Sequence, residues 1–267
     1  MRRALAGIAL VAAAALAAPL CAADNPYPGL AAAYLVQVEG RTLWADAAAR
    51  RLPPASLTKV MTALLVLERG GLQQTTTIST RAAAATGARL RVRAGTRFRI
   101  EDLLVAALVG SANDACRALA EWHSGSEPRF VAAMNRRARA LGLRDTRFAN
   151  ACGFDAAGHY SSAEDLARLA ETAMQNERFR AIVALREALV HDADARRTYR
   201  VETTNALLGR LPGAIGIKSG HTRKAGRCII VLAERGTRHV LLVMLGAANR
   251  WWDAHDVVER AFAAGTR

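Results

Sequence analysis

The chain has 267 residues, and its 37 basic against 23 acidic side chains give a formal net charge of +14. Aromatic residues make up only 5%, and the basic residues are scattered along the chain, which argues against a nucleic-acid reader built on base stacking. We therefore expect no nucleic-acid partner. The basic surface is either a plain solvated surface or one that suits an anionic cell wall or membrane.

The first 23 residues, MRRALAGIALVAAAALAAPLCAA, have the pattern of a secretory signal peptide. They combine two arginines, an apolar run of about a dozen residues and a small-residue end. The apolar run is too short for a convincing membrane anchor. We expect cleavage near Asp24, export from the cytoplasm, and one domain over residues 24–267 without an integral membrane segment.

The N-terminal third of the mature chain mixes short strands with one long helix. Residues 31–45 predict two strands joined across Glu39-Gly40-Arg41. After two prolines, the stretch SLTKVMTALLVLERGG predicts a mostly buried helix that begins at Ser56 and stops at Gly70-Gly71. Residues 75–100 alternate short strand-like runs with glycine turns.

The remainder divides into a helical middle and a strand-rich end. Five helical runs are predicted between 101 and about 190: IEDLLVAALVG, NDACRALAEWH, PRFVAAMNRRARALG, SAEDLARLAETAM and ERFRAIVALREALV. From 198 the strand-like runs are TYRVET, AIGIKSG, GRCIIVLAERG and TRHVLLVMLGA, before an amphipathic C-terminal helix. The last two runs lack clean alternation, as expected for central strands covered on both faces. We therefore predict an α+β fold with an antiparallel sheet from both chain ends and a central helical region.

Three cysteines remain after signal cleavage, Cys116, Cys152 and Cys228. Because three is odd, at least one is expected to be a free thiol in the monomer, and their spacing forms no CxxC metal or redox motif. An oxidising compartment permits one disulfide, and the sequence leaves its pairing open.

The pair Ser56 and Lys59 is the first candidate for chemistry. The 37 basic residues include only three lysines, Lys59, Lys218 and Lys224, so 34 are arginines. Arginine stays protonated, whereas lysine can be made to give up its proton. Lys59 lies three residues after Ser56 on the same helix face, which suits a nucleophile with its base. The alternative is a helix N-cap serine followed by an exposed lysine.

A lysine base must lose its proton near neutral pH, at a cost of about 4–5 kcal/mol from its ordinary pKa. Burial or a second cation would lower that pKa, and Lys218 in the strand-like IGIKSGHT is the candidate cation. Gly220 then marks an edge where a peptide could lie alongside the backbone.

The loop GSANDA supplies the third element. The Ser111 hydroxyl could relay a proton between Lys59 and a leaving group, and the Asn113 amide could hold a substrate carbonyl. Helix capping by Ser111, Asn113 or Asp114 is the alternative. His221, directly after Lys-Ser-Gly, is the one histidine we place near this site, and a structural role fits it equally well.

Signatures of other enzyme classes are missing from the sequence. It contains no G-x-S-x-G elbow, no H-E-x-x-H and no P-loop, which argues against a serine–histidine hydrolase, a zinc protease and an NTPase. We expect neither a metal nor a cofactor.

SLTK, SAN and KSG occur in this order, with gaps of 55 and 107 residues between Ser56, Ser111 and Lys218. In this the chain resembles the penicillin-recognising serine enzymes. It resembles more closely the D-alanyl-D-alanine carboxypeptidase family of low-molecular-mass penicillin-binding proteins. The resemblance is carried by PPASLTKVMTALLVLE, LVGSANDACRALAE, DTRFANACGFDAAGHYSSAEDLARLA and IGIKSGHTRKAGRC, which span residues 53–230.

The resemblance implies a serine β-lactamase/DD-peptidase-like fold and a set of roles. Ser56 would be the acylated nucleophile, Lys59 its base and Ser111 the proton relay. Lys218 with Ser219 would clamp the terminal carboxylate of the substrate, and the backbone N–H groups of Ser56 and His221 would form the oxyanion hole. The implied substrates are peptidoglycan stem peptides, with β-lactams as covalent inhibitors, and the implied location is the periplasm.

Departures from the family pattern keep some alternatives open. Lys-Ser-Gly replaces the commoner Lys-Thr-Gly, and Asn150-Ala151-Cys152-Gly153-Phe154 replaces Asn-Pro-x-Gly-Leu, so the resemblance does not define the loop shape or the substrate preference. The chain ends soon after its last helix, so we expect a protein that is free or held to the wall by charge.

The sequence has three alternative interpretations. TTNALL together with AGRC resembles the endopeptidase branch, which cuts D-Ala–diaminopimelate cross-links. A class A β-lactamase would need a deacylating glutamate, and none occurs between Pro128 and Ala163, so slow release of penicillin is expected. A basic wall-binding protein with a dead site is disfavoured by the intact triad of motifs.

Overall fold

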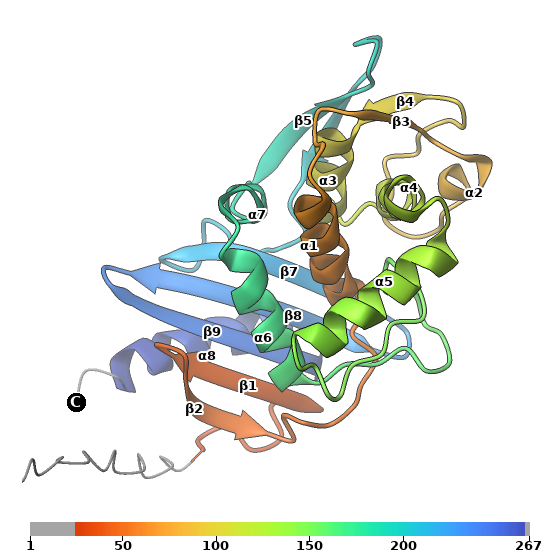
Figure 1. Cartoon of the computed structure of the whole chain (residues 1–267). Coiled ribbons are helices and arrows are strands. Elements are labelled where there is room, and N and C mark those ends of the chain that lie inside the picture. Colours follow the sequence, from red (N-terminus) through yellow and green to blue (C-terminus); the bar gives the residue numbers. More distant parts are fainter. Residues whose placement is uncertain (1–24, 265–267) are drawn as a thin grey trace, which may run out of the picture.

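Strands from the two ends of the chain form one five-stranded antiparallel sheet in the order β2-β1-β9-β8-β7 (Figure 1). The computed structural model describes residues 25–264, so the predicted signal peptide lies outside the described residues. The strands are β1 (Ala33–Val38), β2 (Arg41–Asp46), β7 (Ala214–Thr222), β8 (Gly226–Arg235) and β9 (Arg238–Ala247). β1 pairs with both β2 and β9, which confirms the predicted hairpin and its union with the C-terminal strands.

The helices follow the predicted order. They are the 3₁₀ turn η1 (Ala55–Thr58), α1 (Lys59–Arg69), α2 (Thr80–Ala83), α3 (Ile100–Leu108), α4 (Asn113–Ser124), α5 (Glu127–Ala140), α6 (Ala163–Met174), α7 (Glu177–Val183) and α8 (Arg250–Ala264). Two small two-stranded antiparallel sheets complete the fold: β3 (Thr75–Thr77) with β4 (Arg97–Arg99), and β5 (Glu187–His191) with β6 (Thr198–Glu202).

The large sheet is covered on both faces. α1 and α6 lie with the other middle helices on one face, and α8 crosses the opposite face (Figure 1). Neighbouring residues of one strand therefore enter different cores: Ile230 packs in the cluster on the α1 side, and Val231 packs in the cluster on the α8 side. Double burial explains why the sequences of β8 and β9 are apolar without alternation.

One predicted helix is too long. The run ERFRAIVALREALV is helical only to Val183, and its second half forms β5. In the β5–β6 hairpin Ala188 pairs with Val201, and Val190 pairs with Tyr199. Val190 is fully buried while Leu189 is 60% exposed, so a two-residue burial period replaces the helical one. Cross-strand pairing and core contacts outweigh the helix propensity of Ala, Leu, Arg and Glu in this segment.

A second difference concerns residues 75–100, where strands and turns were expected. The short helix α2 lies within this section, and the hydroxyl of Ser79 accepts a hydrogen bond from the N–H of Ala82 at its start. Within residues 25–264 no helix has the length and apolar character needed to cross a membrane.

Candidate active site

Ser56 lies in the η1 turn, where the chain passes closest to the edge strand β7. Two glycines allow this approach. A Cβ atom on Gly220 would lie 2.8 Å from the Ser56 nitrogen, and one on Gly153 would lie 1.9 Å from the carbonyl oxygen of Ala55. The N-cap position of α1 is held by Thr58 rather than Ser56, so the alternative of a capping serine is not what the structure shows.

Lys59 begins α1 and is only 1% exposed. Its Nζ lies 3.0 Å from Ser56 Oγ, 2.8 Å from Asn113 Oδ1 and 2.7 Å from the Cys152 carbonyl oxygen. A neutral amine has two N–H donors and one lone pair, and the two carbonyl oxygens can only accept. When both N–H groups are used in this way, the lone pair is directed toward the Ser56 hydroxyl. This is the arrangement that a base needs to take the proton of a serine nucleophile.

The electrostatics favour that neutral amine. Burial is the main cause that lowers the pKa of Lys59 well below its ordinary value, and the positive charge of Lys218 adds to the effect. Burial, followed by the nearby Arg250, lowers the pKa of Lys218 to about 7. Both causes named from the sequence, burial and a second cation, therefore act on Lys59, and burial is the larger.

A cleft of about 440 Å³ opens in front of Ser56. Five of the seven predicted site residues line it, and they are Ser56, Ser111, Asn113, Ser219 and His221. Lys59 and Lys218 are each 1% exposed and are absent from this lining. The structure thus brings six of the seven together, the five lining residues and Lys59, which contacts Ser56 Oγ. The seventh, Lys218, is buried beside Ser219, and its charge acts on Lys59.

Backbone geometry positions the two residues of the SAN motif. Ser111 adopts a left-handed conformation with φ of 57° in the segment between α3 and α4 and is 6% exposed. Asn113 begins α4, and its Nδ2 donates to the Thr86 carbonyl oxygen at 2.6 Å, which fixes Oδ1 toward Lys59. The alternative of helix capping does not apply to Ser111 or Asn113, because the N-cap residue of α4 is Ala112.

The KSG segment is part of β7, the edge strand of the sheet. Ser219 Oγ donates to the carbonyl oxygen of Thr204 at 2.9 Å and lies 3.0 Å from its hydroxyl. Lys218 Nζ donates to the Ser219 carbonyl oxygen at 2.9 Å. An edge strand beside a cleft is a surface on which an extended peptide can add as a further strand.

Arg250 is a cleft residue that the sequence did not single out. It is the first residue of α8, and its Nη1 donates to the carbonyl oxygen of Gly220. Its guanidinium carbon lies 4.3 Å from the centre of the Trp251 ring. As one of 34 arginines, at the start of a helix far from the motifs in sequence, it carried no distinguishing signal.

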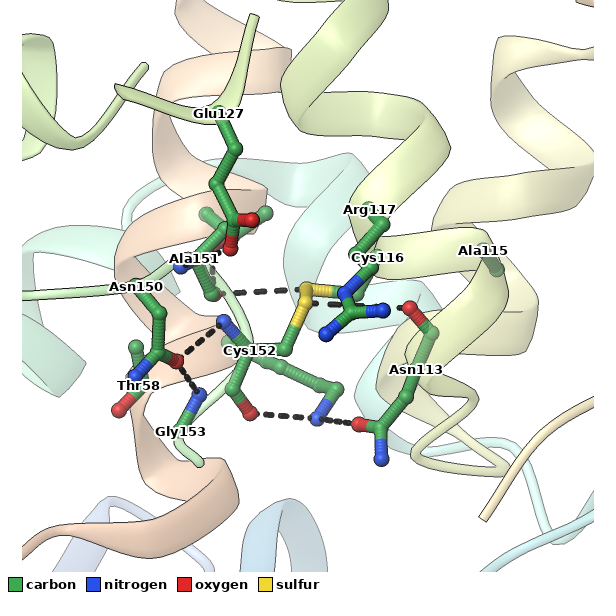
Figure 2. Close-up of a disulfide and its surroundings, with 12 residues drawn as sticks. Thr58, Asn113, Ala115, Cys116, Arg117, Glu127, Asn150, Ala151, Cys152 and Gly153 are labelled. Carbon is green, nitrogen blue, oxygen red and sulfur yellow. Dashed lines mark hydrogen bonds between the residues drawn. A yellow bond between two sulfur atoms is a disulfide. The ribbon is translucent and has the colours of Figure 1, made fainter. Parts of the chain in front are cut away.

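The loop that carries the Cys152 carbonyl has its shape fixed by Asn150. The Asn150 Oδ1 accepts from the N–H groups of Cys152, Gly153 and Phe154, at 3.2, 2.7 and 3.0 Å. A disulfide joins Cys152 to Cys116 on α4 (Figure 2), while Cys228 is a buried free thiol. This answers the question of cysteine pairing that the sequence left open.

His159 supports the turn that carries Ser56, a role that the sequence did not reveal. The N–H of Ala149 donates to His159 Nδ1 at 2.9 Å, so the ring proton lies on Nε2, which contacts the Thr58 hydroxyl at 2.9 Å. That hydroxyl in turn donates to the Ala55 carbonyl oxygen at 2.8 Å. Burial lowers the pKa of His159 to about 4, so the neutral ring that this chain of bonds requires is the stable form at neutral pH.

Among residues 25–264 no group of three or more His, Cys, Asp or Glu side chains is arranged to hold a metal ion. The chemistry available in the cleft is that of a serine with an adjacent amine base, Lys59, next to two further basic groups, Lys218 and Arg250.

The chain is similar to known proteins over most of its length. The sequence profile of peptidase family S11, described as D-alanyl-D-alanine carboxypeptidase, matches residues 27–249. The carboxypeptidase DacF of Bacillus subtilis is 34% identical over 215 residues, covering 79% of this chain and 55% of that protein. The D-alanyl-D-alanine carboxypeptidase of Streptomyces sp. K15 is 30% identical, covering 98% of this chain and 99% of that protein.

Another relative has a different name. The D-alanyl-D-alanine endopeptidase of Pseudomonas aeruginosa is 31% identical, covering 80% of this chain and 70% of that protein. The chain spans about half the length of the B. subtilis relative and nearly the whole length of the Streptomyces one.

Solved structures of D-alanyl-D-alanine carboxypeptidases have a similar fold. The crystal structure of a D-alanyl-D-alanine carboxypeptidase from Mycobacterium tuberculosis superimposes with a TM-score of 0.84 at 29% identity, covering 92% of this chain and 95% of that one. The profile match covers most of the chain and includes all three motifs around the cleft. The chain therefore belongs to the D-alanyl-D-alanine carboxypeptidase family, the S11 serine peptidases, and has their α+β DD-peptidase fold.

Proposed function

We propose that this protein is an exported serine DD-peptidase that removes the terminal D-alanine from peptidoglycan stem peptides through an acyl-enzyme on Ser56. The observation that carries the proposal is the environment of Lys59. Its amine is buried, it lies 3.0 Å from Ser56 Oγ, and its other two neighbours are carbonyl oxygens. A solvent-exposed lysine in the same position would stay protonated and could not act as a base.

The proposed reaction begins when Ser56 Oγ attacks the carbonyl carbon of the last peptide bond. Lys59 takes the hydroxyl proton, and the backbone N–H groups of Ser56 and His221 stabilise the oxyanion. Ser111 relays the proton to the nitrogen of the leaving D-alanine, and the C–N bond breaks. Water then attacks the acyl-enzyme with Lys59 as base, which releases the shortened peptide and restores the Ser56 hydroxyl.

Positive charge in and below the cleft fits the other end of the substrate. The terminal D-alanine carries a free carboxylate, and Ser219, Lys218 and Arg250 form one region at β7 and the start of α8. Hydrogen bonds between charged groups and a carboxylate are the stronger kind, and they fix its orientation. This arrangement supports a preference for peptides that end in a free carboxylate.

Cross-link cleavage is the second candidate. It is favoured by the similarity to the P. aeruginosa endopeptidase and by the position of Thr204 in the TTNALL segment. Thr204 lines the cleft and accepts the hydrogen bond of Ser219, so this segment contributes directly to the site. An endopeptidase would use the same Ser56 chemistry on a bond within a cross-linked dimer.

Penicillins are proposed to acylate Ser56 and to be released slowly. Among the described residues that line the cleft there is no glutamate, and the acidic one is Asp155. The Asp155 carboxylate is engaged by the Thr222 hydroxyl and by the N–H of Lys224. The nearby Glu127 accepts the N–H of Ala151 and pairs with Arg81. Both carboxylates already have hydrogen-bond partners, which supports slow release rather than the rapid deacylation of a class A β-lactamase.

The deciding experiment compares two substrates. Purified mature protein is incubated with a stem pentapeptide and, separately, with cross-linked dimer muropeptides, with Ser56→Ala as the control. D-alanine release from the pentapeptide by the wild type alone supports the carboxypeptidase. Conversion of dimer to monomer without D-alanine release would show the endopeptidase. Turnover of neither substrate would leave a wall-binding protein as the better explanation.

Export is proposed from the N-terminal sequence and has its own test. Expression of the full chain in a Gram-negative host, followed by N-terminal sequencing of the periplasmic protein, is expected to give a start near Asp24. A cytoplasmic protein that still begins at residue 1 would contradict export.

A further inference from the structure

The disulfide joins the two segments that supply the acceptors of Lys59. Asn113 Oδ1 and the Cys152 carbonyl oxygen lie 2.8 and 2.7 Å from Lys59 Nζ. Cys116 follows Asn113 by one turn of α4, and it is bonded to Cys152 itself (Figure 2). The cross-link therefore bridges the two acceptor segments close to Lys59.

The hydrogen bonds of the loop of residues 150–154 lie within the loop or hold it to α1 and α5. The Asn150 side chain bonds within the loop, so it sets the shape of the loop rather than its distance from α4. Ala151 is held by Thr62 of α1 at 2.6 Å and by Glu127 of α5 at 3.2 Å. The disulfide is the covalent tie to α4, the helix that carries Asn113.

We propose that Cys116 and Cys152 are positioning residues for the Lys59 base, and that acylation of Ser56 is faster with the disulfide formed than with it reduced. This rests on the proposed function of Ser56 and Lys59. With the disulfide formed, both carbonyl acceptors stay on the amine, and its lone pair stays directed at Ser56 Oγ. Without it, the Cys152 carbonyl can move away from Nζ, and the amine is free to rotate.

The reduction is balanced with a dithiol as the co-reactant. The Cys116–Cys152 S–S bond breaks and takes up two electrons and two protons, giving two thiols, while the dithiol is oxidised to its cyclic disulfide. Cys152 lines the catalytic cleft, so the bond lies near the route by which small molecules reach Ser56. Ser219 and Arg250, the proposed substrate contacts, lie on β7 and α8, which the disulfide does not join.

The test measures acylation in two steps, with a chromogenic cephalosporin as the probe. The initial dissociation constant and the acylation rate constant are determined for the wild type before and after treatment with a dithiol, and after reoxidation with oxidised glutathione. The same constants are measured for Cys116→Ala/Cys152→Ala and for Cys228→Ala, which removes a buried thiol outside the cross-link. Circular dichroism and thermal unfolding confirm that each protein is folded.

We expect the acylation rate constant to fall by about 10- to 100-fold in the reduced wild type and in the double variant, since misplacement by about 1 Å can cost a factor of about 100. The initial dissociation constant should change by less than about threefold, because a base acts on the chemical step rather than on uniform binding. Reoxidation should restore the wild type, the double variant should be insensitive to the dithiol, and Cys228→Ala should match the oxidised wild type.

A contrary result is equally definite. If the folded double variant, or wild type in which mass analysis shows all three thiols, acylates as fast as the oxidised protein, the positioning role is wrong. A fall in thermal stability alone, with the acylation rate constant per folded molecule unchanged, would make the disulfide purely structural. If the oxidised wild type itself forms no adduct, the proposed function fails instead.

Discussion

Replacing Lys59 by arginine tests whether this residue acts as a neutral base. Arginine keeps the positive charge and the donors, but its guanidinium stays protonated, with a neutral fraction below about 1 in 10⁵ at pH 7. An ordinary lysine would be neutral in about 1 molecule in 2,500, and the burial of Lys59 together with Lys218 raises that fraction further. Loss of general-base catalysis is worth about 10²- to 10⁴-fold. We therefore expect Lys59→Arg to lower the acylation rate constant by about 100- to 10,000-fold.

The other two lysines supply the comparison. Lys218→Arg keeps a positive charge near Ser219 and should mainly weaken substrate binding, so its effect is expected in KM. Lys224 is exposed on the β7–β8 turn, and Lys224→Arg should acylate like the wild type. Acylation by a fluorescent penicillin at pH 7 is measured for all three variants, with circular dichroism as the fold control. If Lys59→Arg acylates within about tenfold of the wild type, a neutral Lys59 is not the base.

Three further predictions follow from single residues. The pKa of Lys218 is about 7, so its positive charge is lost as the pH rises, and kcat/KM for a peptide that ends in a carboxylate should fall above about pH 7. Lys218→Arg should remove that fall. A variant whose pH profile matches that of the wild type would contradict this role of Lys218. The pKa of His159 is about 4 in the folded protein and 6.5 ordinarily, so the unfolded chain binds more protons between these two pH values. The free energy of unfolding should therefore fall by about 3 kcal/mol as the pH drops from 6.5 to 4. Urea unfolding of His159→Gln should show a smaller fall over the same pH range. Gly153→Ala should lower the free energy of unfolding by about 1–3 kcal/mol more than Gly95→Ala does. Both glycines have positive φ (91° and 83°), but only a Cβ on Gly153 would collide with backbone atoms. Equal losses of stability in the two variants would refute the close contact.

The sequence was most informative for the side chains that are proposed to act in the reaction. Ser56, Lys59, Ser111 and Lys218 belong to types whose reactivity depends on their neighbours, and their order along the chain brought them together before the fold was known. The Cys152 carbonyl was missed because a main-chain oxygen has no side-chain signature. Arg250 was missed because it is chemically ordinary among 34 arginines and reaches the cleft only when α8 crosses the sheet.

The sequence predicts the elements of the fold that have strong apolar patterns, and it does not predict every pairing between distant segments. The central strands and the α1 helix are marked by apolar patterns that burial imposes directly. Residues 184–190 follow a helical pattern in sequence, but Val190 and Val201 are buried from paired strands, a long-range contact that local periodicity does not report. The Cys116–Cys152 pairing likewise depends on α4 meeting a loop 36 residues away in the chain.

The central claim is that Ser56 is the acylated residue, and peptide mapping of a penicillin adduct tests it most directly. Trypsin cleavage after Arg51 and Lys59 releases residues 52–59, LPPASLTK, which contain one serine. After incubation with penicillin and acid quenching, we predict that this peptide gains the mass of the intact drug at Ser56 in the wild type and gains none in Ser56→Ala. An adduct on any other peptide, or a wild type that forms no adduct, would contradict the account.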